Sequence, residues 1–369
     1  MIDTQPEMAD SVKNRSTVLI PVFAALVLAG LWLYILPDSG SDAKILVVYC
    51  AHDRIFAEQV LDDFSKETGI RVQARYDTEA TKSLGLINLI VQERSQPRCD
   101  LFWNNELLGM VELQQQGLLE PYRGSSWQRM PERYRDADGY WVGFAARMRV
   151  YIVNTHQASA TEETLGTLFS LEPSRVAMAK PLFGTTLTHY TVLWHLWGGD
   201  RLKMWHRDLR LRGIREVDGN AAVKDIVAQG TCDAGLTDTD DVFVALDDRL
   251  PVEMFPTRVT ADQADKHPSD AANGAPDYTI CIPNTVGIIK GTKRLEAARR
   301  LTDYLASAKA EIALAKSKSR QIPLGPIEGS ELPEDVEQLV EWSHDGIDLR
   351  LLLPARRECL AWLKTEYLK

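Results

Sequence analysis

Short apolar runs alternate with stretches of helical period from residue 45 onward. Residues 45–49 form a continuous apolar run, which is typical of a parallel strand covered on both faces. The next stretch repeats apolar residues at helical spacing and is followed by Gly69, a favoured residue after a helix. A strand at 70–76, a helix at 79–93 and a strand at 101–103 come next. This order predicts an α/β protein with a mostly parallel sheet and helices on both of its faces.

The loops that follow the predicted strands are polar. In sheets of this kind ligands bind at the carboxyl ends of the strands, so these loops are the expected binding site. The same loops also begin helices, and Ser, Thr, Asp and Asn are ordinary helix caps, so each loop has a purely structural interpretation as well. The polar loops lie at 49–53, 77–83, 104–106, 181–186 and 236–241.

The most acidic of these loops contains Asp238, Asp240 and Asp241 directly after an apolar run at 232–236. Like charges this close repel by roughly 4 kcal/mol per pair at 4 Å and an effective dielectric constant near 20. Such a cluster faces water, caps a helix or holds a cation. As a cap, Asp238 would be the N-cap residue of the following helix and Asp241 its partner three positions on. As a cation site, the same carboxylates would bind a hard metal ion.

The N-terminal region predicts export. Residues 18–36 are uncharged and span about 28 Å as a helix, close to the thickness of a bilayer core. Lys13 and Arg15 precede this stretch, which places residues 1–17 in the cytoplasm. We expect a transmembrane anchor at 18–36 and a tether at 37–43, so that the remaining chain lies outside the inner membrane. A cleaved signal peptide is the alternative.

Composition excludes several classes of protein. The 369 residues carry a net charge of −10, which argues against a nucleic-acid-binding protein. The five cysteines show no zinc-type spacing, and we expect them to be small core residues. The sequence has none of the GxSxG, P-loop or HExxH motifs, which argues against an enzyme and against a nucleotide cofactor. No redox cofactor is predicted either.

Eight segments in a fixed order resemble one family. From about residue 44 to about residue 326, the chain resembles the ferric-iron type of extracellular solute-binding protein that serves ABC importers. The segments are VYCAH at 48–52, DTEATKS at 77–83, DLFWNNE at 100–106, GYWVGFAAR at 139–147, PLFGTT at 181–186, GLTDTDD at 235–241, IPNTV at 282–286 and SRQIP at 319–323.

The resemblance implies a fold, a partner and a location. It implies the two-lobe, type II periplasmic-binding-protein fold, with two strands crossing between the lobes and the ligand in the cleft. Lobe one would comprise 44–147 and 286–369, and lobe two 148–285. The crossing strands would lie near 147–153 and 279–289. It also implies a monomer that delivers its ligand to an ABC permease from the periplasm or the cell surface.

The resemblance also implies a metal site. Family members hold ferric iron with adjacent tyrosines at the positions that match Asp240 and Asp241, so this chain departs from the pattern there. Carboxylate oxygens also suit hard cations. His52 and Glu106 match the family's histidine and glutamate ligands, with Asn105 as the alternative to Glu106. The implied metal ligands are therefore His52, Glu106, Asp240 and Asp241, and the implied transported ligand is ferric iron.

An anion is the second predicted ligand. Thr185 and Thr186 precede a predicted helix, whose N-terminus favours an anion. Thr78 and Thr81 offer similar groups from the other lobe, and Arg147 lies on a predicted crossing strand. These residues would hold an anion that accompanies iron, or a small organic carboxylate or phosphonate in its place. A membrane-anchored sensor of such a ligand is a further alternative to transport.

Overall fold

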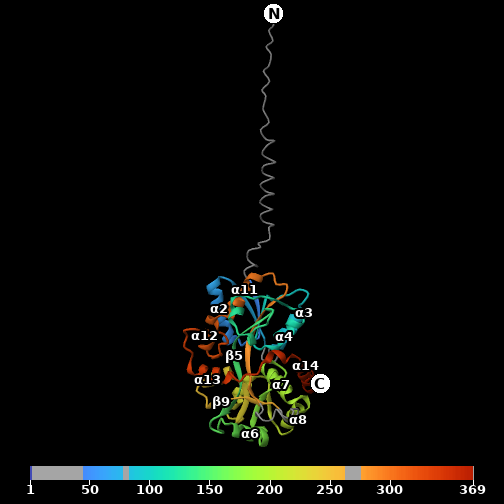
Figure 1. The fold of residues 1–369 in the computed structure, drawn as a ribbon, viewed down its shortest axis with the longest axis vertical. Coiled ribbons are helices and arrows are strands. Elements are labelled where there is room, and N and C mark those ends of the chain that lie inside the picture. Colours follow the sequence, from blue (N-terminus) through green and yellow to red (C-terminus); the bar gives the residue numbers. More distant parts are fainter. Residues whose placement is uncertain (2–44, 78–82, 262–275, 369) are drawn as a thin grey trace. The chain divides into compact units, whose positions relative to one another are not determined.

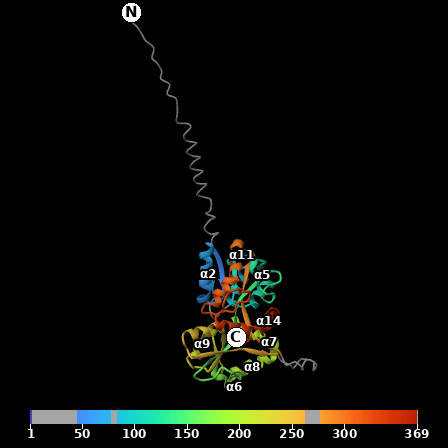
Figure 2. The same ribbon diagram turned by 60° about the vertical axis from the view of Figure 1, so that its left-hand side comes forward.

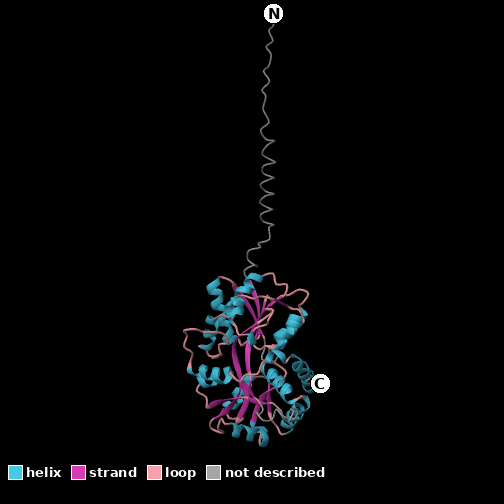
Figure 3. Cartoon of the chain, viewed as in Figure 1, coloured by secondary structure: helices cyan, strands magenta, loops and turns pink. Residues whose placement is uncertain are grey.

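The computed structural model describes residue 1 and residues 45–77, 83–261 and 276–368. The predicted anchor at 18–36, Thr78 and Thr81 lie outside these residues. Among the helices that are described, none is both long and apolar enough to span a bilayer. The described chain from residue 46 forms two α/β lobes, each with strands at its centre and helices around them (Figure 1, Figure 3).

Lobe one contains the strands predicted first along the chain. Their order is β2-β1-β3-β12-β5, with β4 also pairing with β12. β1 and β3 are parallel, with Val48 opposite Leu101, whereas β12 runs antiparallel to β3. The strands are β1 (Ile45–Cys50), β2 (Arg71–Tyr76), β3 (Leu101–Asn104), β4 (Leu119–Glu120) and β12 (Cys281–Ile289). The helices are α2 (Arg54–Thr68), α3 (Leu84–Gln92), α4 (Leu108–Gln115), α5 (Ser125–Arg129), η3 (Glu132–Tyr134), α11 (Leu295–Leu305) and α12 (Ala308–Ala315).

Lobe two continues the same sheet in the order β5-β8-β6-β7, and β9 pairs with β5. The strands are β5 (Val142–Asn154), β6 (Val176–Ala179), β7 (Arg215–Val217), β8 (Ala234–Asp238), β9 (Val252–Pro256) and the separate ribbon β10 (Arg258–Thr260) with β11 (Asp277–Thr279). The helices are α6 (Glu162–Leu171), η4 (Pro173–Arg175), α7 (Gly184–Trp197), α8 (Gly199–Leu211), α9 (Asn220–Ala228) and α10 (Thr239–Asp247). A turned view shows α6, α7, α8 and α9 together in this lobe (Figure 2).

Two strands connect the lobes, as predicted. β5 pairs with β12 through residues 142–148 and with β8 from Arg149 onward. Almost every residue of this strand is buried, Arg147 and Arg149 included, as expected of a strand that pairs with the strands of both lobes. The second connection runs from β11 into β12, where Arg149 N–H donates to the Ile280 carbonyl at 3.0 Å.

The C-terminal helices lie near the level at which the lobes meet (Figure 1). These are α13 (Glu334–Ser343), η6 (Leu349–Leu351) and α14 (Leu353–Tyr367). α14 contacts both lobes: Arg356 pairs with Glu112 of α4 in lobe one, and Trp362 packs against Trp194 of α7 in lobe two. The C-terminal segment thus adds a helical connection to the two crossing strands.

Lobe two encloses a buried histidine beneath α14. His206 is 0% exposed, and its two ring nitrogens contact the hydroxyls of Tyr190 (2.9 Å) and Tyr367 (3.2 Å). Tyr367 in turn donates to Glu216. Burial is the main cause that lowers the pKa of His206 from 6.5 to about 4, and the charge of Arg210 adds to it. The neutral ring therefore links the C-terminal helix to the core of lobe two.

The pKa of His206 predicts how stability depends on pH. The folded state favours the neutral ring, so His206 contributes to the free energy of unfolding in full above pH 6.5, the pKa of the unfolded chain. This contribution is lost as the pH falls toward and through about 4, the pKa in the folded protein. The loss amounts to roughly 3 kcal/mol. We expect His206→Gln to flatten the decline of unfolding free energy between pH 6.5 and 4 in urea titrations, relative to the exposed control His156→Gln. Parallel curves for the two variants would contradict this assignment.

Candidate cation-binding site

A small cavity lies between the two lobes. Its volume is about 30 Å³, enough for one ion or a water molecule. Asp53 and Asn105 reach it from lobe one, and Arg147 reaches it from the crossing strand β5. The remaining lining residues come from lobe two: Ala179, Lys180, Phe183, Gly184, Thr185, Thr186, Asp218, Gly219, Asn220, Asp238, Asp240 and Asp241. Most of these residues follow the carboxyl ends of strands, as the predicted α/β order implies.

The acidic run brings three carboxylates to this cavity. Asp238 ends β8, and Asp240 and Asp241 lie in the first turn of α10. One ligand atom from each of the three lies within 4.8 Å of the others, and the same holds for His52, Asp53 and Asp240. The positive end of the α10 dipole favours carboxylates at this place. Both groups of residues have the composition of a site for a hard cation.

The predicted helix cap at Asp238 is wrong in one respect. Asp238 occupies the N-cap position of α10, but its side chain makes no capping hydrogen bond. It pairs instead with the fully buried Arg149 at 2.7 Å and accepts from Thr185 Oγ1 at 2.5 Å. Asp241 is likewise bound to Thr237 Oγ1 at 3.0 Å. Distant partners for Asp238 and a hydroxyl four residues earlier for Asp241 have therefore replaced the expected capping hydrogen bonds.

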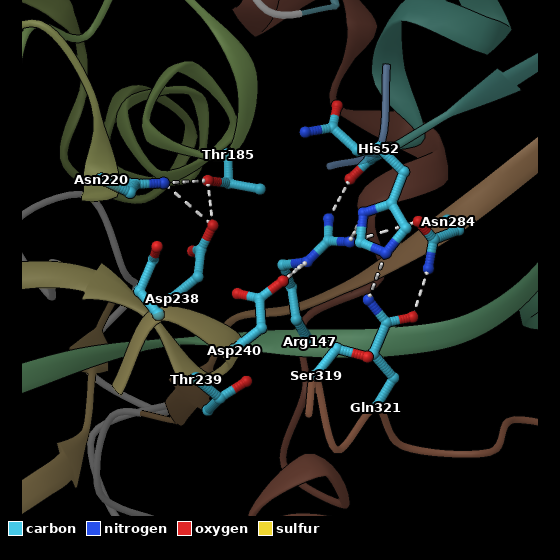
Figure 4. Close-up of polar contacts among 12 residues, drawn as sticks. His52, Arg147, Thr185, Asn220, Asp238, Thr239, Asp240, Asn284, Ser319 and Gln321 are labelled. Carbon is cyan, nitrogen blue, oxygen red and sulfur yellow. Dashed lines mark hydrogen bonds and ion pairs between the residues drawn. The ribbon is translucent and has the colours of Figure 1, made fainter. Parts of the chain in front are cut away.

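Arg147 lies at the centre of the site (Figure 4). Its guanidinium donates from Nε to Asp240 Oδ2 at 3.0 Å and from Nη1 to the Asn105 carbonyl at 2.7 Å. Nη2 contacts His52 Nδ1 at 2.9 Å and Asn284 Oδ1 at 3.2 Å. Arg147 is 2% exposed and Asp240 3%, so this ion pair is shielded from water. One side chain thus joins residues of both lobes.

His52 is buried beside Arg147, where the sequence placed a metal ligand. Its ring lies 5.5 Å from the ring of Trp103, and its Nε2 is 3.0 Å from Gln321 Nε2. Asn284 and Gln321 hold this arrangement, yet sequence reasoning gave them no role. The only available signal was their position in the two late segments of the family resemblance.

Asn105 and Glu106, the two alternative metal ligands predicted after β3, point in different directions. Glu106 turns into lobe one, where its Oε1 accepts from the backbone N–H of Gly109 (2.8 Å) and from Ser83 Oγ (3.1 Å). It does not line the cavity. Asn105 does, and its Oδ1 is buried without a hydrogen-bond partner among the described residues. An unpartnered acceptor oxygen at this wall is suited to a cation or to a hydrogen-bond donor.

The predicted anion-binding residues that the structure describes also lie here. Thr185 and Thr186 are in the first turn of α7, and both line the cavity. Thr185 Oγ1 donates to Asp238, and Thr186 Oγ1 donates to Asn220 Oδ1 at 3.1 Å. Asn220 begins α9 after β7 and was not predicted, although it shares the strand-end position of the other loops.

Comparison with known proteins identifies the family. Residues 46–317 match the family model of bacterial extracellular solute-binding proteins. The chain belongs to this family. As a solute-binding protein it acts outside the cytoplasm by binding rather than by catalysis, which confirms the resemblance, the two-lobe fold and the prediction that it is not an enzyme.

Individual relatives of this solute-binding protein are distant. The Fe(3+)-binding periplasmic protein of Serratia marcescens is 26% identical over 227 residues, which cover 61% of this chain and 65% of that protein, just under two thirds of its length. The structure of apo ferric ion-binding protein A from Pasteurella haemolytica has a TM-score of 0.71 at 18% identity and covers 88% of this chain and 97% of that one. The periplasmic binding protein AfuA from Actinobacillus pleuropneumoniae, with fructose-6-phosphate bound, has a TM-score of 0.70 at 17% identity (87% and 98% covered). Both structures show the shared fold.

The buried pair of Arg149 and Asp238 yields a stability prediction. We expect Asp238→Asn to destabilise this solute-binding protein by about 3–5 kcal/mol, because it leaves the guanidinium buried without its counter-charge. The matched control is Asp138→Asn, which breaks an exposed pair with Arg123 and should cost at most about 1 kcal/mol. Guanidinium chloride titrations measure both values. Equal stabilities of the two variants would contradict the cost expected for a buried guanidinium without its counter-charge.

Proposed function

We propose that this solute-binding protein captures ferric iron between its lobes and passes it to an ABC permease. The single observation that carries the proposal is the size of the inter-lobe cavity. At about 30 Å³ it accommodates one ion, whereas a sugar phosphate or a similar organic ligand requires several hundred Å³. This size supports an ion rather than an organic molecule as the ligand.

The charge of the cavity supports a cation. Among the described residues that line it, five aspartates face one arginine and one lysine. A second buried arginine, Arg149, neutralises one of these aspartates, Asp238, which leaves an excess of two negative charges. A low-dielectric cavity with this excess attracts a multivalent cation and repels a free anion.

The donor set supports a hard metal ion. Asp240 groups with His52 and Asp53 of lobe one, and separately with Asp238 and Asp241 of lobe two. We propose His52, Asp240 and Asp241 as three donors, with His52 buried beside the cavity rather than in its lining. We propose Asn105 as the fourth donor in place of Glu106, because its free Oδ1 is at the cavity and the Glu106 side chain is not. Mixed oxygen and nitrogen donors suit iron. The names of the Serratia and Pasteurella relatives, which refer to ferric ion, agree with this choice.

An anion is the second candidate, supported by the N-terminus of α7. Gly184, Thr185 and Thr186 line the cavity at the positive end of this 14-residue helix. The AfuA structure, with fructose-6-phosphate bound, shares the fold. In our proposal this helix end would hold an anion that accompanies the metal, and an organic anion as sole ligand is the alternative that the tests below distinguish.

Closure of the lobes supplies the transport mechanism in this proposal. A ligand shifts the equilibrium between open and closed lobes only through its different affinity for the two states. A metal ion that contacts His52 from lobe one and Asp240 from lobe two gains these contacts only when the lobes are closed. The closed monomer would then dock on the permease.

The function predicts the effect of removing the acidic pair. We expect Asp240→Ala with Asp241→Ala to abolish binding of iron supplied as ferric nitrilotriacetate. The matched control is Asp62→Ala with Asp63→Ala, an adjacent pair on α2 away from the cavity. Trp103 lies 5.5 Å from His52, so quenching of tryptophan fluorescence by ferric iron reports occupancy. Unchanged quenching in the first variant would remove the metal from these residues, and binding of fructose 6-phosphate alone would favour an organic anion.

We further propose that residues 18–36 anchor the protein in the inner membrane next to its permease. We expect the full chain to remain with membranes after a high-salt wash, and a variant lacking residues 1–43 to be released. If expression of the full chain gives a soluble product with a shortened N-terminus, the segment is a cleaved signal peptide instead. A neighbouring gene for a permease would favour transport over an anchored sensor.

A further inference from the structure

The guanidinium of Arg147 contacts two of the proposed metal ligands, Asp240 and His52. Asp240 Oδ2 accepts from its Nε at 3.0 Å, and His52 Nδ1 lies 2.9 Å from its Nη2. Nη1 is bound to the main chain of Asn105 at 2.7 Å, the residue whose side-chain oxygen also lines the cavity. A positive group that belongs to the protein therefore lies among the proposed ligands.

His52 faces a second N–H donor besides Arg147, the side-chain amide of Gln321. The indole N–H of Trp103 can only donate, and it fixes Asn284 Oδ1 at 3.2 Å. Asn284 Nδ2 then donates to the Ala145 carbonyl and to Gln321 Oε1 (2.8 Å), which turns Gln321 Nε2 toward His52 Nε2. Both ring nitrogens thus face N–H donors. A neutral imidazole carries one N–H and accepts at one nitrogen only, so these two contacts cannot both be hydrogen bonds.

The position of Arg147 couples this contact to the lobes. Arg147 lies on β5 opposite Ile282, at the last stretch of pairing with lobe one before Arg149 pairs with β8 of lobe two. Its side-chain partners come from lobe one (His52, Asn105) and from lobe two (Asp240). The guanidinium therefore supplies, without cargo, the same bridge between the lobes that a bound cation would supply.

We propose that Arg147 is a built-in competitor of the cargo, a tethered cation that occupies the ligand position and sets the affinity and specificity of the site. The inference rests on the proposed function and adds a regulatory element to it. A multivalent ion displaces the guanidinium from Asp240 and His52 because its higher charge gains more from the carboxylates. A monovalent ion is attracted to the carboxylates no more strongly than the guanidinium of Arg147, so it does not displace Arg147. Cargo binding then releases an arginine from the site.

The test compares substitutions of the buried Arg147 and of Arg129, which is partly buried. We expect Arg147→Gln to bind ferric iron, supplied as ferric nitrilotriacetate, at least tenfold more tightly than the wild type, because the competing charge is gone. The control is Arg129→Gln, which removes a guanidinium from the buried carboxylate Glu311 (2.7 Å) outside the cavity and should leave affinity unchanged. Gallium nitrilotriacetate measured by calorimetry serves as a redox-inert second probe. Sodium ions at 0.2 M should weaken gallium binding to Arg147→Gln more than binding to the wild type.

A second variant covers the case in which Arg147→Gln does not fold. Arg147→Lys keeps the charge, but one ammonium cannot bind Asp240, His52 and Asn105 at once, so we expect affinity to rise about threefold. Weaker or equal binding in the Arg147 variants, with the wild type binding metal, overturns this inference and assigns Arg147 to holding an anion. Absence of metal binding in both the wild type and Arg147→Gln overturns the proposed function itself. The two failures are thus distinguishable.

Discussion

Two arginines on one face of a crossing strand hold the acidic run in place, and the binding site depends on this pairing. Arg147 and Arg149 are two positions apart on β5, so their side chains lie on the same face of the strand. Asp238 and Asp240 are also two apart, and each takes one arginine, at 2.7 Å and 3.0 Å respectively. Between them, the backbone N–H of Met148 donates to Thr239 Oγ1 at 3.2 Å. The repulsion within the acidic run is therefore neutralised by a strand more than 80 residues earlier in the chain.

These ion pairs position β5, β8 and the start of α10 more than they add to the stability of the fold. Buried ion pairs contribute little net stability, because the loss of hydration offsets their attraction. Breaking one partner is nevertheless costly, so the pairs fix the register of β5 against β8 and the start of α10. The pair at Arg149 lies within lobe two and is structural. The pair at Arg147 spans the junction of the lobes, and it is the one that a ligand can replace.

Local patterns predicted the elements well and the contacts of the site poorly. The run at 45–49 and the alternation at 70–76 became β1 and β2, because apolar patterning is set by burial of each strand. The crossing strands were predicted from the family resemblance, and the structure buries almost every residue of both. By contrast, the capping role of Asp238 was lost to Arg149, a partner that no local pattern reveals. Sequence could not choose between Asn105 and Glu106, because they are adjacent after β3 and point in different directions. The Glu106 carboxylate accepts from the backbone N–H of Gly109 in α4, which leaves Asn105 at the cavity.

In the proposed metal site, aspartates stand at the positions where the family resemblance implies tyrosines, and this changes what a cation must compete with. Ligands bind metal in their deprotonated form, and phenols ionise near pH 10 whereas carboxylates ionise near pH 4. A pair of tyrosines therefore keeps its protons at neutral pH until a metal displaces them. Aspartates are already ionised there, and two bare carboxylates in a buried cavity would repel each other. Arg147 supplies the missing positive charge at Asp240. In the proposed site the guanidinium therefore balances a ligand charge until a metal displaces it, as the phenolic proton does in a tyrosine site.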